Sequence, residues 1–532
     1  MPVFSDAKNL APLPLGTSAF ETLRERGQIY VDKTGLIYKF ASKSEKFFLT
    51  RPRRFGKSLL VSTLASLFSK GLQYFSGLAI ERLWKDKTYR VVEIDFSEVK
   101  NFIDFEDFRE RLGYLLIHSF ERAGFQYDSC KTEDAISQIS LWLKGQEKNS
   151  LVLLIDEYDA PHTACLESEE LFQKIRSLLA SFYAVVKAND ACWRFVFVTG
   201  ITKFNQTGIF SELNTFTDIS LFPEFASLLG YSEEDIQCYF GGYVNQAARA
   251  LDVSEEVLQK RMREYYDGYC FDDQISERVY APWSVLNFLS WPTHGFENYW
   301  TQSGGSLTLL QKYLHSHSLK APESYAIEKE ISHDELTAST DFAGINDVVL
   351  LTQAGYLTLK RRSGRFFYVS YPNKEVADSL AALYTDMLLK NHSLEFVGAG
   401  RLPEALQEGN IDLLFDQANH AFAGIDSVHH PITEEKHCQA FLQIFISGAG
   451  FSATVENHGA LGRSDLEVDV RNYHWIFELK FLRVGGDPKV LLEEAAKQII
   501  SRNYGATSFK KRIRVAAVFS EEKRQFVCWE RL

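Results

Sequence analysis

The stretch FLTRPRRFGKSLL, residues 48–60, joins the end of an apolar strand, a basic loop and the start of an apolar helix. Its GKS at 56–58 matches the end of the phosphate-binding pattern G-x-x-x-x-G-K-[ST]. In that pattern, backbone N–H groups at a helix N-terminus bind the phosphates. Arg51 stands at the first glycine, which weakens the match because arginine disfavours the backbone angles that glycine allows. Pro52 can rigidify the loop in compensation, and an ordinary turn with a basic cluster is the alternative.

The surrounding sequence alternates short apolar runs with helical patterns. Near-continuous apolar strands separated by helices predict a parallel α/β sheet that is covered on both faces. The predicted fold class is therefore α/β, a P-loop NTPase with a parallel sheet flanked by helices, over residues 1–224. The expected strands are 45–50, 91–96, 150–159 and 193–200, and the expected helices are 58–68, 105–123 and 168–188.

A second motif lies on the same predicted sheet. The strand LVLLIDEYD ends in adjacent carboxylates, Asp156 and Glu157. In a nucleotide hydrolase the first would hold Mg²⁺ and the second would polarise the attacking water. A strand can also end in Asp-Glu as a helix cap, but the order and spacing of both motifs favour a site. We expect Gly56, Lys57, Ser58 and Asp156 to bind ATP, Ser58 and Asp156 to bind Mg²⁺, and Glu157 to be catalytic.

Several stretches resemble the bacterial AAA-ATPase-like family, which often carries a C-terminal PD-(D/E)XK nuclease domain. They include YVDKT, FFLTRPRRFGKSLLVSTLASLF, LLIDEYDAP and FVTGITKFNQTGIFSELNTFTDIS, and further on YYDGYCF, VYAPWSVLNFL, AGYLTL and YPNKEV. The resemblance covers most of the chain. The family's loop also has Arg-Pro-Arg-Arg-Phe before Gly-Lys-Ser, so the resemblance implies that the missing glycine is a family feature.

The resemblance extends to further residues of the nucleotide site. It implies that Thr199 senses the γ-phosphate, with a plain Thr-Gly strand end as the alternative. Arg53, Arg54 and Lys203 are candidates to supply charge to phosphate, or they are surface residues; Arg54 is the one we assign to the nucleotide. The Asp-Lys pair of YVDKT lies where such folds often contact the base.

A second constellation is GRSDLEVDVRNYHWIFELKF, residues 462–481. Glu478 and Lys480 lie two apart on one strand and therefore face the same way, and a hairpin can bring Asp465 close to them. Two carboxylates with the carbonyl of residue 479 make an oxygen site suited to Mg²⁺ or Mn²⁺. Lys480 would orient or deprotonate water, or stabilise charge on a phosphate. An exposed strand of alternating charge is the alternative, although a half-buried Glu–Lys pair needs partners.

The arrangement D-x₁₂-E-x-K resembles the PD-(D/E)XK nuclease core, with Ser464 in place of the proline. The resemblance implies that Asp465, Glu478 and Lys480 are catalytic. It also implies a further metal ligand at Glu435, with Glu434 as the alternative, on the helix before the hairpin. Gln498 matches a glutamine on the helix after the core. Such domains can lose activity and keep binding, so an inactive nuclease fold remains an alternative.

The rest of the chain is divided by its patterns. The stretch 347–376 predicts a helix end and a two-stranded hairpin between helices. The aromatic residues of 265–300 are expected to serve packing. The predicted parts after the first domain are a helical lid region (225–320), a winged-helix-like module (321–400), a helical connector (401–430) and a restriction-endonuclease-like α/β domain (431–532).

Composition limits the class of protein. Hydrophobic residues make up 45% and charged residues 24% of the 532 residues, which is ordinary globular composition. No apolar run approaches the roughly 20 residues needed to span a bilayer. Seven dispersed cysteines without a C-x-x-C pair argue against a zinc ribbon or a disulfide framework and predict a reducing cytoplasm. Net charge is −12, but residues 471–532 hold thirteen Lys/Arg and seven Asp/Glu, which permits a nucleic-acid surface there or a solvated mixed-charge one.

Together these patterns predict a cytoplasmic ATP-binding regulator fused to a metal-dependent nuclease. The expected cofactors are ATP and Mg²⁺, with Mn²⁺ as an alternative at the nuclease site. The expected substrate is nucleic acid, DNA in preference to RNA, with no membrane involved, and a homo-oligomer is compatible with the resemblance. Two rival hypotheses remain: a nucleotide-switched binding module with an inactive nuclease fold, and an ATPase that remodels a protein partner.

Overall fold

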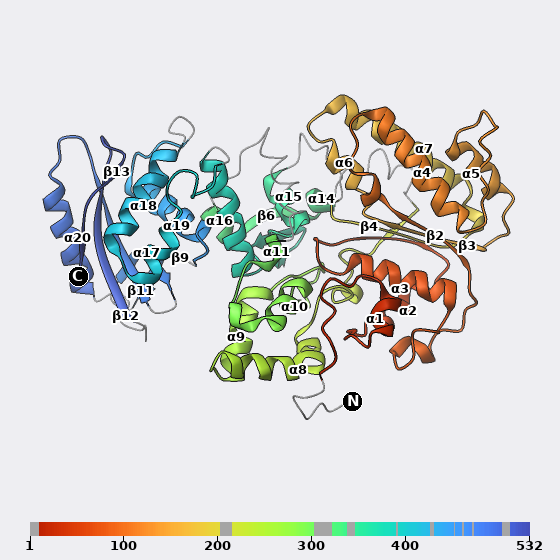
Figure 1. Cartoon of the computed structure of the whole chain (residues 1–532), viewed down its shortest axis with the longest axis horizontal. Helices are drawn as coiled ribbons and strands as arrows, with labels where there is room; N and C mark the ends of the chain where they lie inside the picture. Colours follow the sequence, from red (N-terminus) through yellow and green to blue (C-terminus); the bar gives the residue numbers. More distant parts are fainter. Residues whose placement is uncertain are drawn as a thin grey trace. The chain divides into compact units, whose positions relative to one another are not determined.

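The computed structural model separates into two compact units, which are described one at a time (Figure 1). The first comprises residues 1–319 and 328–373, and the second residues 320–327 and 374–532. The structure describes residues 10–202, 215–302, 322–337, 346–389, 392–425, 430–451, 453–459, 462–470, 473–502 and 511–532.

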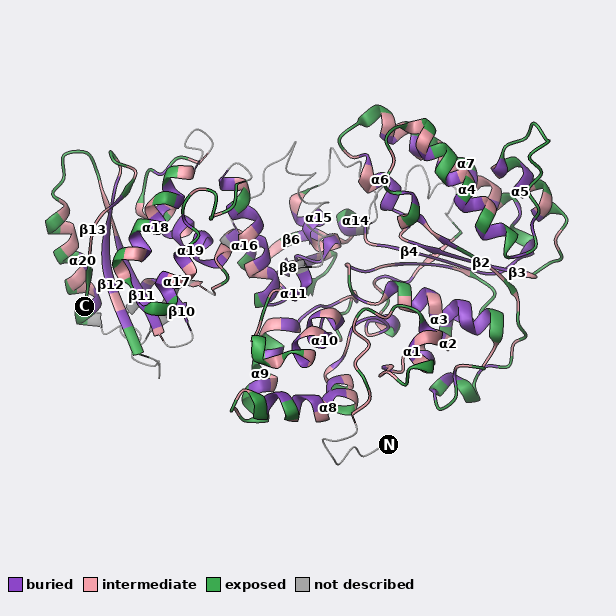
Figure 2. Ribbon diagram, viewed as in Figure 1, coloured by how far each residue is buried: buried purple, intermediate pink, exposed green. Residues whose placement is uncertain are grey.

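The first unit is built on a five-stranded parallel sheet in the order β2-β3-β4-β1-β5. Strands β3 and β4 are buried along their whole length (Figure 2), because α4, α5 and α7 cover one face and α1, α2 and α3 the other (Figure 1). The predicted parallel α/β sheet is therefore confirmed. The strands are β1 (Lys46–Thr50), β2 (Arg90–Asp95), β3 (Leu151–Asp156), β4 (Trp193–Gly200) and β5 (Thr217–Asp218).

The helices around this sheet follow the apolar periodicity of the sequence. The longest, α7, turns Phe172, Ile175 and Leu179 into the core, and Ser168 caps its N-terminus. The helix α5 was not among the predicted ones. The helices are α1 (Phe20–Glu25), α2 (Thr34–Ala41), α3 (Lys57–Lys70), α4 (Phe105–Glu121), α5 (Ala135–Lys144), α6 (Ala160–Ala164) and α7 (Glu169–Ala188).

A helical region with its own aromatic core follows. Tyr266, Phe288 and Phe296 pack on one another, with ring centroids 4.4 to 5.9 Å apart. The helices are α8 (Glu233–Ala250), α9 (Glu255–Tyr266), α10 (Pro282–Ser290) and α11 (Tyr299–Gln302).

The first unit ends in a small module with a three-stranded antiparallel sheet, ordered β6-β8-β7. The predicted hairpin is β7–β8, and β6 adds an edge strand that the sequence did not reveal. Asn373 donates from Nδ2 to the carbonyl of Asp267 at 2.9 Å, and a methyl group on Gly268 would lie 2.3 Å from the carbonyl oxygen of Pro372. The stretches YYDGYCF and YPNKEV thus hold the module in place. Its elements are β6 (Lys329–Ser332), α14 (His333–Thr337), α15 (Asp347–Ala354), β7 (Thr358–Ser363) and β8 (Phe366–Ser370).

The second unit contains a five-stranded mixed sheet in the order β13-β12-β11-β10-β9. Strands β11 and β12 are parallel and joined through α20, which covers one face, whereas α17, α18 and α19 cover the other (Figure 1). Its elements are α13 (Pro322–Ala326), α16 (Lys374–Leu388), α17 (Leu402–Glu408), α18 (Ile411–Gly424), α19 (Glu435–Gly448), β9 (Ala453–Gly459), β10 (Gly462–Asp469), β11 (Tyr473–Leu482), α20 (Pro488–Arg502), β12 (Lys511–Ser520) and β13 (Gln525–Arg531).

The helices α17 and α18 lie in the stretch predicted as a connector, and they pack on this sheet. The buried indole of Trp475 donates to the carbonyl of Leu406 at 3.0 Å, and that of Trp529 donates to Asp412 at 2.8 Å. The side chain of Asn419 donates to the carbonyl of Phe526 and accepts from its N–H. These bonds make α17 and α18 a layer of the C-terminal fold.

Candidate nucleotide and metal sites

In the loop between β1 and α3, the residues with positive φ angles are not those that the usual glycine pattern predicts. Gly56 is the N-cap of α3 with φ of 93°, and Arg54 is also left-handed with φ of 67°. Arg51, at the first-glycine position, has an ordinary negative φ. The loop therefore needs no glycine at position 51, and the strained conformation falls on Arg54, where a non-glycine residue is uncommon.

The side chain of Arg51 fastens the loop to the body of the first unit. It is only 2% exposed. Its guanidinium donates to the carbonyls of Ser220 at 2.7 Å and Phe225 at 3.2 Å, and lies over the ring of Phe271, 4.5 Å from the centroid. Burial lowers the pKa of Arg51 to about 9. Arg51 is thus a structural residue of the loop, with its charge turned to backbone carbonyls.

Lys57 is buried at the start of α3. Its Nζ donates to the carbonyls of Arg51 and Pro52, both at 3.0 Å. Burial lowers the pKa of Lys57, and the carboxylates of Asp156 and Glu157 oppose this only in part. The ammonium is therefore held by loop carbonyls and lies within the field of Asp156, the predicted Mg²⁺ ligand, and of Glu157, the predicted catalytic carboxylate.

Ser58 and Asp156, predicted to bind Mg²⁺ together, lie near each other. The hydroxyl of Ser58 acts to lower the pKa of the Asp156 carboxylate, which is only 4% exposed. Burial raises the pKa of Asp156, whereas Ser58 and Lys57 act in the opposite direction. A hydroxyl and a carboxylate are hard oxygen ligands that suit Mg²⁺.

Asp95 is a neighbouring carboxylate that the sequence analysis did not single out. It ends β2 and is in register with Asp156 on β3. Its charge raises the pKa of Asp156, after the larger effect of burial, and its Oδ1 accepts from the N–H of Ser97 at 2.8 Å. The available signal was that VVEID ends in aspartate in the same way as LVLLID.

Glu157 follows the strand in a left-handed conformation, with φ of 47°. Such strain in a non-glycine residue persists only where the surroundings hold it. Burial raises the pKa of Glu157, and the charges of Arg53 and Lys57 lower it.

Arg54, which was predicted to bind the nucleotide, lies with its guanidinium over the ring of Trp283, 4.4 Å from the ring centroid.

Thr199 is the penultimate residue of β4, the strand between β1 and β3. It is fully buried, and its Oγ1 has no hydrogen-bond partner among the described residues. Its carbonyl accepts from the N–H of Tyr158 at 3.1 Å. A buried hydroxyl without a partner is rare, and it fits a ligand oxygen arriving at this edge of the sheet.

Asp159, the second aspartate of IDEYD, organises the chain after β4. Its carboxylate accepts from the N–H of Ile201 at 3.2 Å, and from the N–H and hydroxyl of Thr202 at 2.8 and 2.7 Å. The hydroxyl of Tyr158 donates to the carbonyl of Thr202 at 2.6 Å. The sequence analysis missed this role, because nothing near Asp159 in sequence indicates what its carboxylate contacts.

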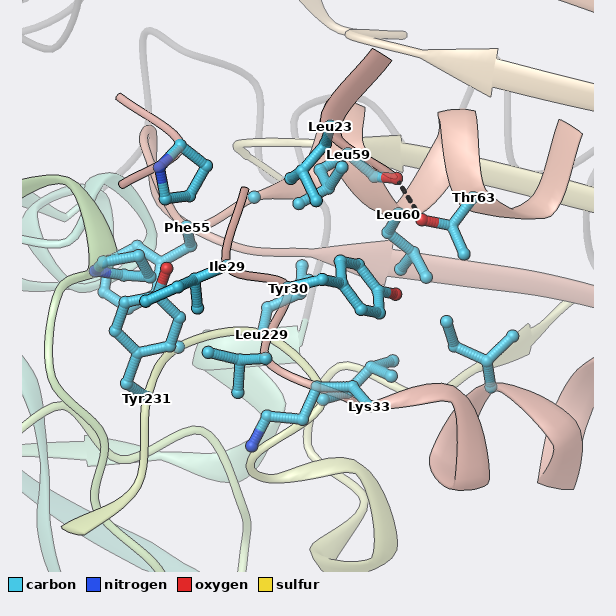
Figure 3. A pocket seen from close by; sticks show the side chains of 17 residues that line it. Leu23, Ile29, Tyr30, Lys33, Phe55, Leu59, Leu60, Thr63, Leu229 and Tyr231 are labelled. Atoms are coloured by element: carbon cyan, nitrogen blue, oxygen red, sulfur yellow. Dashed lines mark hydrogen bonds between the residues drawn. The ribbon is translucent and has the colours of Figure 1, made fainter. Parts of the chain in front are cut away.

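An apolar pocket lies beside Gly56 and the first turns of α3 (Figure 3). Lys33 lines it, but its Nζ forms an ion pair with Asp235 at 2.5 Å. Asp32 instead accepts hydrogen bonds from the N–H groups of Thr34 and Ala79. Of the predicted Asp-Lys pair, only Lys33 therefore reaches the pocket. The other lining residues are Pro14, Leu23, Ile29, Tyr30, Val31, Ile37, Phe55, Gly56, Leu59, Leu60, Thr63, Leu228, Leu229, Gly230, Tyr231 and Pro282.

In the second unit the structure brings Asp465, Glu478 and Lys480 together. Lys480 Nζ lies 3.2 Å from Oε1 of Glu478 and 3.2 Å from the carbonyl oxygen of Leu479. Oδ2 of Asp465 accepts from the N–H of Leu479 at 2.7 Å. The side chain of Gln439 on α19 donates to the backbone carbonyl of Asp465. The hairpin and α19 thus position the predicted set.

Glu478 is fully buried, and its Oε2 has no hydrogen-bond partner among the described residues. Burial, followed by the charge of Asp465, raises the pKa of Glu478 to about 7. A buried oxygen without a partner fits a divalent cation. Across the described ranges, three or more His, Cys, Asp or Glu side chains nowhere converge as a metal cage, so the ligands that fit are Asp465, Glu478 and the Leu479 carbonyl.

The two candidate glutamates at the start of α19 differ in surroundings. Glu435 lies 3.9 Å from Nζ of Lys480, and burial raises its pKa. Glu434 lies 3.6 Å from Nε2 of His437 instead. Gln498 is half-buried on α20, one turn after Glu494, whose charge also raises the pKa of Glu435. Glu494 therefore lies on the side of α20 that is near Glu435, whereas Glu434 is turned toward His437.

A buried polar group beside Asp465 escaped the sequence analysis. Ser464, at the position of the family's proline, donates to Oε1 of Glu467 at 2.7 Å. Oε2 of Glu467 lies 3.2 Å from Nε2 of His474. The sequence signal, Glu467 two residues after Asp465 on the same strand face, is weak because alternating charge is common in strands.

Two family models match the chain. Residues 14–210 match the family described as a predicted AAA-ATPase, and residues 433–530 match the PD-(D/E)XK nuclease superfamily. The chain combines a predicted AAA-ATPase domain with a PD-(D/E)XK nuclease superfamily domain. The family resemblance expected from the sequence is therefore confirmed.

A curated relative is similar over nearly the whole chain. It is an uncharacterized protein in the vnfD 5' region of Azotobacter chroococcum mcd 1, 29% identical over 483 residues, which are 89% of this chain and 90% of the relative. A solved structure, a Walker-type ATPase of Pyrococcus abyssi, aligns with 70% of this chain and 99% of its own at 11% identity and a TM-score of 0.34. This structural likeness is too weak to support an inference. In the described ranges, no helix has the length and apolar character needed to cross a bilayer.

Substitution of Gly200 tests the packing at the edge of the AAA-ATPase-like sheet. A methyl group there would lie 2.5 Å from Oδ1 of Asp159 and from the ring of Tyr158. We expect Gly200→Ala to lower the free energy of unfolding by about 1–3 kcal/mol, the usual cost of overpacking. Denaturant unfolding measures this, with Gly113→Ala as the control, because a methyl group on Gly113 meets nothing within 4 Å. Equal stability of the two variants would contradict this packing.

The raised pKa of Glu478 predicts pH-dependent metal binding by the nuclease-like domain. A carboxyl with a pKa of about 7 must lose its proton before it binds a cation, so protons compete with metal below that pH. We expect Mn²⁺ affinity without nucleotide to fall about tenfold from pH 8 to pH 6. Calorimetry measures it. Glu478→Gln should abolish the binding and Glu434→Gln should retain it; an affinity that does not change over this range would refute the prediction.

Proposed function

We propose that this protein hydrolyses ATP and uses nucleotide binding to control metal-dependent cleavage of nucleic acid by its nuclease domain. The observation that carries the proposal is the convergence of Asp465, Glu478 and Lys480, together with the buried Oε2 of Glu478, which has no hydrogen-bond partner within the described parts of the chain. The match of the two family models to opposite ends of the chain supports the pairing of an ATPase with a nuclease.

The AAA-ATPase-like domain supplies the groups that ATP requires. Backbone N–H groups at the N-terminus of α3 are oriented to bind phosphate. When ATP binds, Nζ of Lys57 can donate its hydrogen bonds to phosphate oxygens in place of the carbonyls of Arg51 and Pro52. Ser58 and Asp156 would hold Mg²⁺, which supplies charge neutralisation for the phosphates. Glu157 would orient the attacking water, and the buried hydroxyl of Thr199 would contact the γ-phosphate.

The pocket beside Gly56 is a suitable place for the base. Its lining is mainly apolar and aromatic, which suits the flat faces of a base. Tyr30, Phe55 and Tyr231 present rings in it (Figure 3). We assign the base to this pocket and the phosphates to the loop that borders it.

The nuclease domain supplies two carboxylates, a carbonyl and a lysine. Asp465, Glu478 and the Leu479 carbonyl would hold Mg²⁺ or Mn²⁺, which supplies Lewis acidity at the phosphate and activates water. Burial lowers the pKa of Lys480, but Glu478, Glu435 and Asp465 together raise it above its usual value. Lys480 therefore remains charged at neutral pH and can stabilise negative charge on the scissile phosphate.

The substrate and the compartment complete the proposal. Residues 471–532 carry an excess of Lys and Arg over Asp and Glu, of thirteen to seven, which suits a polyanion. We favour DNA over RNA, and cleavage assays with both distinguish them. All seven cysteines are free thiols, which suits a reducing cytoplasm. The proposal requires no particular oligomeric state.

Lys57→Ala and Glu157→Gln test the ATPase half. Loss of a charge-assisted contact to phosphate should weaken ATP binding at least about tenfold. Loss of the water-orienting carboxylate should preserve binding and slow hydrolysis about a hundredfold or more. Nucleotide binding and phosphate release measure these effects. Lys70→Ala, on the same helix but paired with Glu21 at the surface, is the control, and wild-type behaviour of both site variants would show that the assignment is wrong.

Glu478→Gln and Lys480→Ala test the nuclease half. Each should reduce cleavage of single- or double-stranded DNA in Mg²⁺ or Mn²⁺ to background, because one removes a metal ligand and the other removes charge at the phosphate. Neither should alter ATP binding. Arg401→Ala, at an exposed arginine that pairs with Glu404 outside the basic stretch, should cleave like wild type. Undiminished cleavage by Glu478→Gln would exclude this active site, and an inactive wild type would favour the nucleotide-switched binding module.

A further inference from the structure

The phosphate-binding loop is held by residues that lie outside the stretch matched to the AAA-ATPase model. The ring of Phe55 lies 4.8 Å from that of Tyr269 and 5.1 Å from that of Phe271. Arg54 stacks on Trp283, and Arg51 on Phe271. The helical region after residue 210 therefore contacts side chains along the loop.

Pro52 and Arg53 are held by the small module and by α11. The C-cap of α15, Gly355, is left-handed with φ of 90°, and a methyl group on it would lie 2.5 Å from Cβ of Pro52. The indole of Trp300 donates from Nε1 to the carbonyl of Arg53 at 3.3 Å. The rings of Trp300 and Tyr356 meet edge to face at 5.0 Å.

We propose that Trp300 and Gly355 are positioning residues of the nucleotide site, holding the loop in its anion-binding conformation. This inference rests on the proposed ATP site. The loop places a non-glycine residue, Arg54, in the left-handed region with φ of 67°, so its own sequence does not favour this conformation. Strained backbone persists where surrounding contacts over-determine it, and the contacts of Trp300 and Gly355 do so at Arg53 and Pro52.

The proposal makes the module of residues 328–373 part of the nucleotide site. If its position sets ATP affinity, ATP binding must in turn bias its position by the same free energy. The chain leaves this module at Asn373 and enters the second unit at Lys374. The module is thus joined through the chain to the second unit at both of its ends, at Ile327–Glu328 and at Asn373–Lys374, which provides a covalent route by which nucleotide binding can influence the nuclease unit.

Gly355→Ala tests the close packing of Gly355 against the ring of Pro52. The added methyl group should displace Pro52 and weaken ATP binding at least about fivefold, the lower range expected for overpacking. Removing both clashing atoms of Pro52, in the double variant Pro52→Gly with Gly355→Ala, should restore affinity to within about twofold of Pro52→Gly alone. Gly364→Ala is the matched control, because Gly364 belongs to the same module, is left-handed with φ of 60°, and a methyl group there meets nothing within 4 Å.

Trp300→Phe provides a test that does not depend on the strained glycine. It keeps an aromatic ring and removes the donor to Arg53, so KM for ATP should rise about threefold or more while kcat changes less. Equal ATP affinity for Gly355→Ala and Gly364→Ala, or an unchanged KM in Trp300→Phe, would overturn the proposal. If Lys57→Ala also binds ATP like wild type, the proposed ATP site itself fails, which separates the two outcomes.

Discussion

The parallel alignment of β1, β3 and β4 is the constraint on which the nucleotide site depends. Because all carboxyl ends of a parallel sheet meet at one edge, the loop after β1, the carboxylates after β3 and Thr199 at the end of β4 are brought together. The proximity of Ser58 to Asp156 and the position of Lys57 follow from that alignment. Burial at this edge raises the pKa values of Asp156 and Glu157 and lowers that of Lys57. Burial therefore disfavours the charged form of each group, and a bound ligand of opposite charge would offset this cost.

Much of the first unit could be predicted because its signals are local. Fully buried strands appear as continuous apolar runs, and the order of the GKS and IDE motifs indicated a sheet with one functional edge. Arg51 could not be understood in this way. Its guanidinium donates hydrogen bonds to carbonyls roughly 170 residues away in the chain, and no local sequence pattern predicts partners at that separation. The same holds for Asp159 and for the contact between Pro52 and Gly355.

In the second unit, the pattern D-x₁₂-E-x-K located the hairpin because strand periodicity decides which side chains share a face. The choice between Glu434 and Glu435 required the structure, since both stand at the start of α19 and only their contacts differ. The packing of α17 and α18 on the sheet also could not be predicted. The apolar periodicity of an amphipathic helix predicts that one face is buried, but it does not indicate which part of the protein that face packs against.

ATP control of the nuclease is the central claim, and the ratio of cleavage rates with and without ATP tests it most directly. Nucleotide can influence the nuclease only if ATP binds one arrangement of the protein better than another. The account predicts that ATP changes the rate of DNA cleavage in wild type and that Lys57→Ala, which cannot bind ATP tightly, removes the change. Wild-type cleavage at the same rate with and without saturating ATP would contradict the claim, even with both sites active.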